Sequence, residues 1–152
     1  MNRPRLAIVL AFAALLAVGA PACGGGDDSD QFREDYNAAV DKLSKINTDI
    51  GTAAGGATKQ SNKAIANEFD QIADTAEQTR SRLSDLDPPE DAKDEFDKLL
   101  SALETGVQDL RAVAKAARAN SPQEANQAVK KLAQTGQQIT EAENALKAAV
   151  EG

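Results

Sequence analysis

The residue with the most distinctive chemistry in this sequence is its one cysteine, Cys23. The chain has 152 residues, with no second cysteine and no histidine. A lone cysteine cannot form an internal disulfide, so the fold must depend on packing. Without histidine, the chain lacks the commonest general base and the commonest metal ligand. The distinctive chemistry therefore reduces to that of one thiol near the start of the chain.

The residues before Cys23 have the three-part order of a secretory signal peptide. A short positive start is followed by 13 apolar residues, Leu6–Val18, and then by small residues. As a helix, this run would span about 20 Å, whereas the hydrocarbon core of a bilayer is about 30 Å thick. We therefore expect residues 1–22 to be a cleaved leader rather than a permanent transmembrane helix.

Cys23 stands directly after Ala20-Pro21-Ala22 and before Gly24-Gly25-Gly26-Asp27-Asp28-Ser29. This arrangement resembles the lipobox of bacterial lipoproteins. In that family the thiol is diacylglycerylated, the leader is cut just before the cysteine, and the new amino group is often acylated. The resemblance implies that Cys23 is lipidated, that the bond between Ala22 and Cys23 is cleaved, and that the protein is anchored to the extracytoplasmic face of the cell membrane.

One position departs from the lipobox pattern. The family usually has leucine three residues before the cysteine, where this chain has Ala20. The segment Ala20-Pro21-Ala22 also fits the A-x-A pattern of ordinary signal peptidase, and the alternative is a freely secreted protein. An exposed thiol in an oxidising compartment is chemically vulnerable, which favours lipidation. Two or more acyl chains would anchor the protein stably, and we expect residues 23–30 to be a flexible tether.

Residues 31–152 are the predicted helical domain. Apolar residues recur there at three- and four-residue steps, the spacing of amphipathic helices. The expected helices span residues 29–50, 58–86, 88–119 and 122–150. No stretch shows the alternation of apolar and polar residues that is typical of a strand.

The ends of these predicted helices carry local signals. Asp87-Pro88 with Glu90, and Ser121-Pro122 with Glu124, both fit a helix start with a capping box. The glycine-containing stretch 51–57 predicts a loop or kink after the first helix, because each glycine costs a helix about 1 kcal/mol. Acidic residues gather at the start of the third helix and basic residues toward its end, which complements the helix dipole.

Short connections between long amphipathic helices favour antiparallel neighbours. The predicted fold is all-α: an antiparallel up-down bundle of four helices, with the first helix shorter and looser. Two alternatives remain, a three-helix bundle with a flexible N-terminal segment and an elongated coiled-coil assembly with other chains. Much of the apolar composition is alanine, so we expect a thin core.

Charge and motifs exclude several classes of function. The net charge is −7, and it becomes −9 once Arg3 and Arg5 leave with the leader. This balance argues against nucleic acid as a partner and against docking on anionic lipids. The acidic run 85–97 lacks calcium-loop spacing, so we interpret it as acids at a helix N-terminus. No nucleophile motif is present, and the usual di-metal bundle would need histidine.

The order of a short leader, Cys23 and a Gly/Asp spacer before a helical domain also resembles small envelope lipoproteins of high-GC Gram-positive bacteria. We therefore expect a non-enzymatic interaction or structural module of the cell envelope, with no cofactor, no metal site and an envelope protein as partner. The alternative is a small-molecule-binding or sensory bundle, in which a thin core and Gly136 leave room for a ligand. In that case Tyr36 is a candidate ligand contact at a mouth of the bundle.

Overall fold

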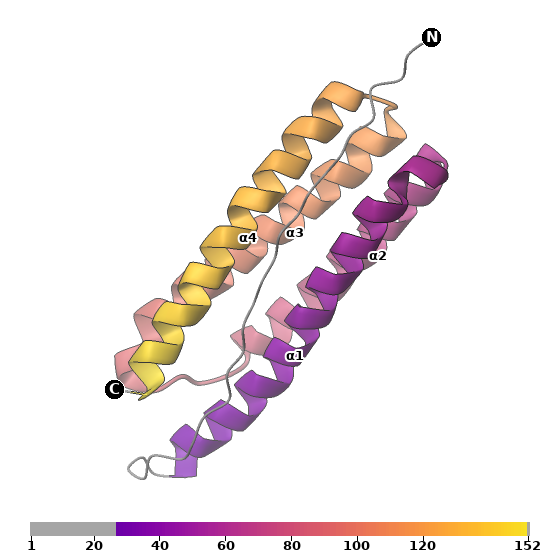
Figure 1. Ribbon diagram of the computed structural model, residues 1–152. Coiled ribbons are helices and arrows are strands. Elements are labelled where there is room, and N and C mark those ends of the chain that lie inside the picture. Colours follow the sequence, from indigo (N-terminus) through magenta and orange to yellow (C-terminus); the bar gives the residue numbers. More distant parts are fainter. Residues whose placement is uncertain (1–26, 152) are drawn as a thin grey trace.

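The computed structural model describes the backbone of residues 27–151 and the side chains of residues 31–151. Four long helices cross the molecule in alternating directions (Figure 1). They are α1 (Asp27–Gly56), α2 (Asn62–Ser84), α3 (Lys93–Arg118) and α4 (Pro122–Glu151). Two short 3₁₀ turns, Ala57–Lys59 and Glu90–Ala92, precede α2 and α3. No strand occurs in residues 27–151, and the predicted all-α antiparallel four-helix bundle is confirmed.

The core is built from the apolar stripes of all four helices. One cluster lies where the end of α1 meets the start of α2, and it contains Ile46, Phe69 and Leu110. The other lies where α1 begins and α4 ends, around Phe96 and Leu146. Among the residues whose side chains are described, alanine supplies eight of the twenty buried apolar residues. Because alanine is small, the helices can pack closely, and each alanine contributes less buried surface than a large side chain would.

The helices do not share the packing equally. Helix α2 packs along α3, α3 packs along α4, and α1 packs mainly along α2. Helix α3 therefore lies in the middle of the packing order, with α2 on one side and α4 on the other. Nine of its residues are buried, whereas α4 buries three.

The prediction that the first helix is the shorter one was wrong. Helix α1 has 30 residues and continues through Gly51 and Gly55, whereas α2 has only 23. The two glycines lie in open space on the exposed side of α1, while Ala53 between them is fully buried in the core. Burial of this turn offsets the cost of the glycines, which is about 1 kcal/mol each.

The predicted start of the third helix at Pro88 was also wrong. The chain stays extended through Pro89, whose φ is −52° and ψ 147°, and α3 begins only at Lys93 after a 3₁₀ turn. Because a proline disfavours the helical conformation of the residue before it, Pro89 keeps Pro88 out of the helix. Asp87 consequently caps no helix.

The predicted restart at Ser121 is confirmed in part. Ser121 Oγ accepts a hydrogen bond from the backbone N–H of Glu124 at 3.5 Å, and α4 begins at Pro122 as expected. The return half of the capping box does not form, because the backbone N–H of Ser121 already donates to the carbonyl of Ala116 at 3.1 Å. That bond belongs to a Schellman motif, which places Asn120 in the left-handed region at φ 51°.

Candidate functional site

The residues to which the sequence assigns chemistry lie outside the described part of the chain. Cys23, Ala22 and the predicted leader 1–22 all precede residue 27, where the description begins. Part of the predicted tether 23–30 is included, and there Asp27–Asp30 form the first turn of α1. The boundary between tether and domain therefore moves from residue 31 to residue 27.

The end of the bundle that follows this segment is tied together by aromatic and polar contacts. The ring of Phe32 in α1 stacks on Tyr36 with centroids 5.8 Å apart and meets Phe96 of α3 edge-on at 5.6 Å. Arg33 Nη2 donates a hydrogen bond to the carbonyl of Val150 in α4 at 2.7 Å. These contacts join the first turns of α1 to α3 and to the last turn of α4, at the end of the bundle where α1 begins and α4 ends (Figure 1).

Tyr36 lies at this end of the bundle, where the sequence placed a candidate ligand contact. Its side chain is half-buried against Phe32 and interacts electrostatically with the carboxylate of Glu143 on α4. Burial, with Glu143 adding to it, raises the pKa of the Tyr36 phenol far above its usual value. Burial likewise raises the pKa of Glu143. A phenol held neutral in this way can donate a hydrogen bond but is a poor source of a nucleophilic phenolate.

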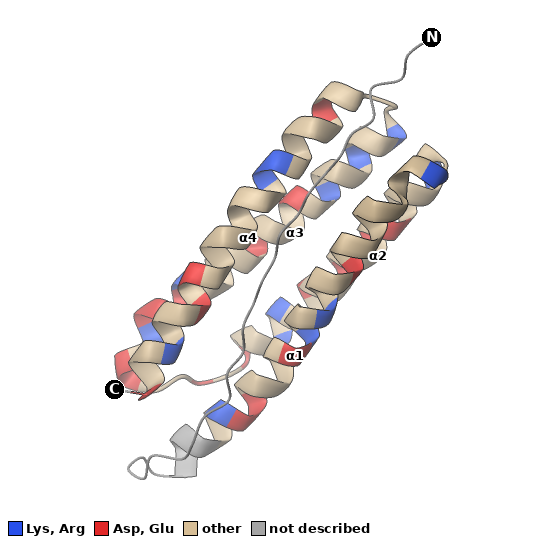
Figure 2. Cartoon of the chain, in the orientation of Figure 1, with Lys and Arg blue, Asp and Glu red and all other residues tan. Residues whose placement is uncertain are grey.

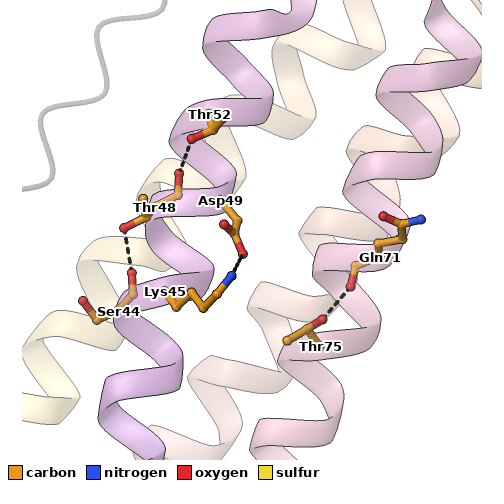
Figure 3. Close-up of polar contacts among 7 residues, drawn as sticks. All are labelled: Ser44, Lys45, Thr48, Asp49, Thr52, Gln71 and Thr75. Atoms are coloured by element: carbon orange, nitrogen blue, oxygen red, sulfur yellow. Dashed lines mark hydrogen bonds and ion pairs between the residues drawn. The ribbon is translucent and has the colours of Figure 1, made fainter.

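A groove of about 260 Å³ runs between α1 and α2. Its hydroxyl groups bond within their own helices: Thr75 Oγ1 donates to the carbonyl of Gln71 at 2.9 Å, and Thr52 Oγ1 donates to that of Thr48 at 3.0 Å (Figure 3). The Asp49 carboxylate pairs with Lys45 at 3.1 Å. Three polar side chains of the groove are therefore already bonded within their own helices, while Glu68 and Gln71 also line it.

A larger groove of about 470 Å³ lies between α3 and α4. Its floor is made of small side chains such as Ala102, Ala142 and Ala145. On its rim, Lys98 Nζ pairs with Glu95 Oε1 at 2.7 Å. Gly136, which the sequence suggested would leave room for a ligand, lines neither this groove nor the one between α1 and α2.

The acidic run 85–97 lies around the start of α3, as the sequence suggested. Glu90 and Asp91 are in the 3₁₀ turn, and Asp94 and Glu95 are in the first turn of α3. Two bases, Lys115 and Arg118, are in the last turn of the same helix, so the predicted match to the helix dipole is confirmed. In residues 31–151, whose side chains are described, no group of three or more Asp, Glu, Cys or His side chains is placed to hold a metal ion.

Sequence reasoning missed one buried polar link between α3 and α4. Thr135 is 4% exposed and donates through Oγ1 to Asp109 Oδ2 at 2.7 Å. Helix α4 also comes close to α3 at Gly106, where an added Cβ would lie 3.4 Å from Ile139 Cδ1 and 3.8 Å from Thr135 Cγ2. The sequence pointed to Gly136 for such an approach. The available signal was the spacing of Thr135, which lies seven residues after buried Ala128. Seven residues are about two helical turns, so Thr135 is expected on the same side of α4 as Ala128, the side that faces α3.

No protein-family model, no curated protein and no solved structure matches the chain. Among the described residues 27–151, no helix combines the length and apolar character needed to cross a membrane.

Proposed function

We propose that the mature protein is a lipid-anchored extracytoplasmic lipoprotein whose helical bundle is a non-enzymatic interaction or structural module of the cell envelope. One observation carries the proposal: the chain's only cysteine stands directly after an apolar leader and three small residues. The acyl chains on Cys23 would hold the protein at the membrane. The bundle would then present its surface to other envelope components.

The start of α1 gives this anchor a geometric consequence. Helix α1 begins at Asp27, only four residues after Cys23. Four residues of chain reach at most about 14 Å. The acyl chains would therefore keep the end of the bundle that contains Phe32 and Val150 close to the lipid headgroups, and the opposite end would point away from the membrane.

Two observations support an interaction module over an enzyme. The chain has no histidine, and it lacks the nucleophile motifs that would compensate for that absence. In the groove between α1 and α2, the side chains of Asp49, Thr52 and Thr75 bond within their own helices, which leaves fewer polar groups to converge on a reacting atom.

The proposal is tested by replacing the thiol. We expect Cys23→Ala to release the protein from the membrane fraction or to leave the leader uncut, because no other side chain can take the acyl group. Wild-type protein should be extracted only with detergent. Ser29→Ala is the matched control, since it changes one small side chain in the same stretch and keeps the thiol.

Fractionation of cells that express each variant, with immunoblotting for size, gives the answer. If Cys23→Ala remains in the membrane and is processed to the same size as the wild type, lipidation of this residue is disproved. If it alone appears in the medium at the mature size, or accumulates at the precursor size, the proposal stands.

A further inference from the structure

Charge is distributed unevenly along the long axis of the bundle. The half that contains the α1–α2 connection and the α3–α4 turn comprises residues 46–73 and 106–136, and it carries seven basic and five acidic side chains. The other half comprises 31–45, 74–105 and 137–151, and it carries eight basic and sixteen acidic side chains. We call the first of these the distal half; in Figure 2, blue residues gather toward its end and red ones toward the opposite end.

The charges at one end of the bundle have little electrostatic effect on a ligand bound at the other end. Helix α4 has 30 residues and is therefore about 45 Å long. Charges on a protein surface are screened over about 8 Å at physiological ionic strength. A ligand at the distal end thus responds to the local bases, and the net charge of −7 does not describe what it meets.

The turns at the distal end are held side by side. Asn62 Nδ2, at the start of α2, donates a hydrogen bond to Asn120 Oδ1 in the α3–α4 turn at 2.6 Å. Lys63 is the residue after Asn62, and its side chain is exposed. Five exposed lysines belong to this end and to the two turns of α4 below it: Lys59, Lys63, Lys115, Lys130 and Lys131.

These lysines differ in pairing from four of the five lysines in the other half, where Lys42 is the exception and Lys45 pairs with Asp49. Lys93, Lys98 and Lys147 each lie within 4 Å of a glutamate on their own helix or the turn before it. None of the five distal lysines makes an ion pair with another residue of the described chain, and the nearby Arg118 pairs with Asp70. The five distal lysines therefore form a group of exposed bases that no carboxylate of the described chain neutralises through an ion pair.

We propose that the distal end binds a linear, phosphate-bearing polymer that carries no bases. A single exposed lysine contributes little, so a ligand gains affinity only by meeting several at once. Lysine ammonium groups bind phosphate as point charges, and each contact releases counterions from a polyanion. The described aromatic rings are buried, as at Phe69, or lie at the opposite end, so none is placed to stack on nucleic-acid bases.

This inference is independent of the lipid anchor. Binding at the distal end requires only the folded bundle, whereas anchoring requires only Cys23. If both hold, the lysines face away from the membrane, because α1 begins at the other end. Loss of one property leaves the other measurable.

The test is titration of the full chain in detergent with long-chain inorganic polyphosphate at low and physiological salt. The key variant combines Lys115→Gln, Lys130→Gln and Lys131→Gln. The matched control combines Lys93→Gln, Lys98→Gln and Lys147→Gln, which removes the same charge from equally exposed positions at the acidic end. We expect the distal variant to bind roughly tenfold more weakly with a shallower salt dependence, and the control to bind within about twofold of wild type.

Several results would overturn the inference. One is equal weakening in both triple variants, which would show a response to net charge alone. Another is an absence of binding at low salt while circular dichroism shows a folded chain. A third is tighter binding to a single-stranded oligonucleotide than to polyphosphate of equal charge. A fourth is binding to vesicles of anionic lipid without binding to polyphosphate.

Discussion

Helices α3 and α1 have similar amphipathic sequences and very different surroundings. Helix α3 packs against a neighbour on each side, and its one glycine, Gly106, faces Ile139 and Thr135 at van der Waals distance. Helix α1 packs mainly along α2, and its Gly51 and Gly55 face open space. An apolar stripe thus specifies that a segment is helical, while its place in the packing order decides how much of that stripe is covered.

The largest effect on stability is expected from a substitution in the middle of α3, where both neighbouring helices cover the apolar stripe. Leu103 is 6% exposed and packs in the cluster around Phe96 and Leu146. Leu103→Asp should lower the free energy of unfolding by roughly 4 kcal/mol or more, because it removes a core side chain and buries a carboxylate. Thermal denaturation followed by circular dichroism measures the effect. Ser101→Asp, on the exposed side of the same helix, is the control and should shift stability by about 0.5 kcal/mol at most. Equal melting of the two variants would show that the buried face of α3 is assigned wrongly.

Alanine substitutions at the glycines of α1 and α3 test the same difference in surroundings with smaller changes. Gly51→Ala and Gly55→Ala should each stabilise the protein by about 1 kcal/mol, because alanine favours the helix and the new methyl group meets no atom within 4 Å. Gly106→Ala should gain less, since its methyl group must fit against Ile139 Cδ1 at 3.4 Å. Urea denaturation of the three single variants orders them directly. A loss of stability at Gly51 would mean that α1 does not continue as a helix through this residue.

The smallest effect is expected where α1 meets α4. Burial raises the pKa of Glu143, so the folded state favours the neutral carboxyl. The contribution of this group to stability is therefore fully present below its unfolded pKa and is lost as the pH rises through the folded value. Glu143→Gln should raise the melting temperature slightly at pH 7 and leave it unchanged at pH 4. A lower melting temperature of Glu143→Gln than of the wild type at pH 7 would indicate that the surroundings of Glu143 stabilise its carboxylate.

The outcome for each prediction follows from how local its signal is. The stripe through Phe96, Leu99 and Leu103 and the cap at Ser121 depend on nearest neighbours in one helix, and they were predicted correctly. The continuation of α1 through Gly51 depends on burial of Ala53 against another helix, which no local pattern contains. At Pro88, two local rules conflicted, and the restriction imposed by Pro89 outweighed the preference for proline in a first turn.

The functional predictions divide in the same way. The proposed lipidation of Cys23 rests on a linear order of residues that the sequence displays except at Ala20, and these residues lie outside the described structure. The distal lysines come from three separate parts of the chain and are brought together only by the antiparallel packing and the contact between Asn62 and Asn120. The net charge of the whole chain, which is −7, gives no sign that these lysines lie at one end of the bundle.

The most direct test of the account is the intact mass of the native protein isolated from the membranes of its own cells. We predict a polypeptide that begins at Cys23 and is heavier than its amino-acid composition by a diacylglyceryl group, with or without a further acyl chain. A mass that corresponds to an unmodified chain beginning at Met1, or to an unmodified chain beginning at Cys23, would contradict it.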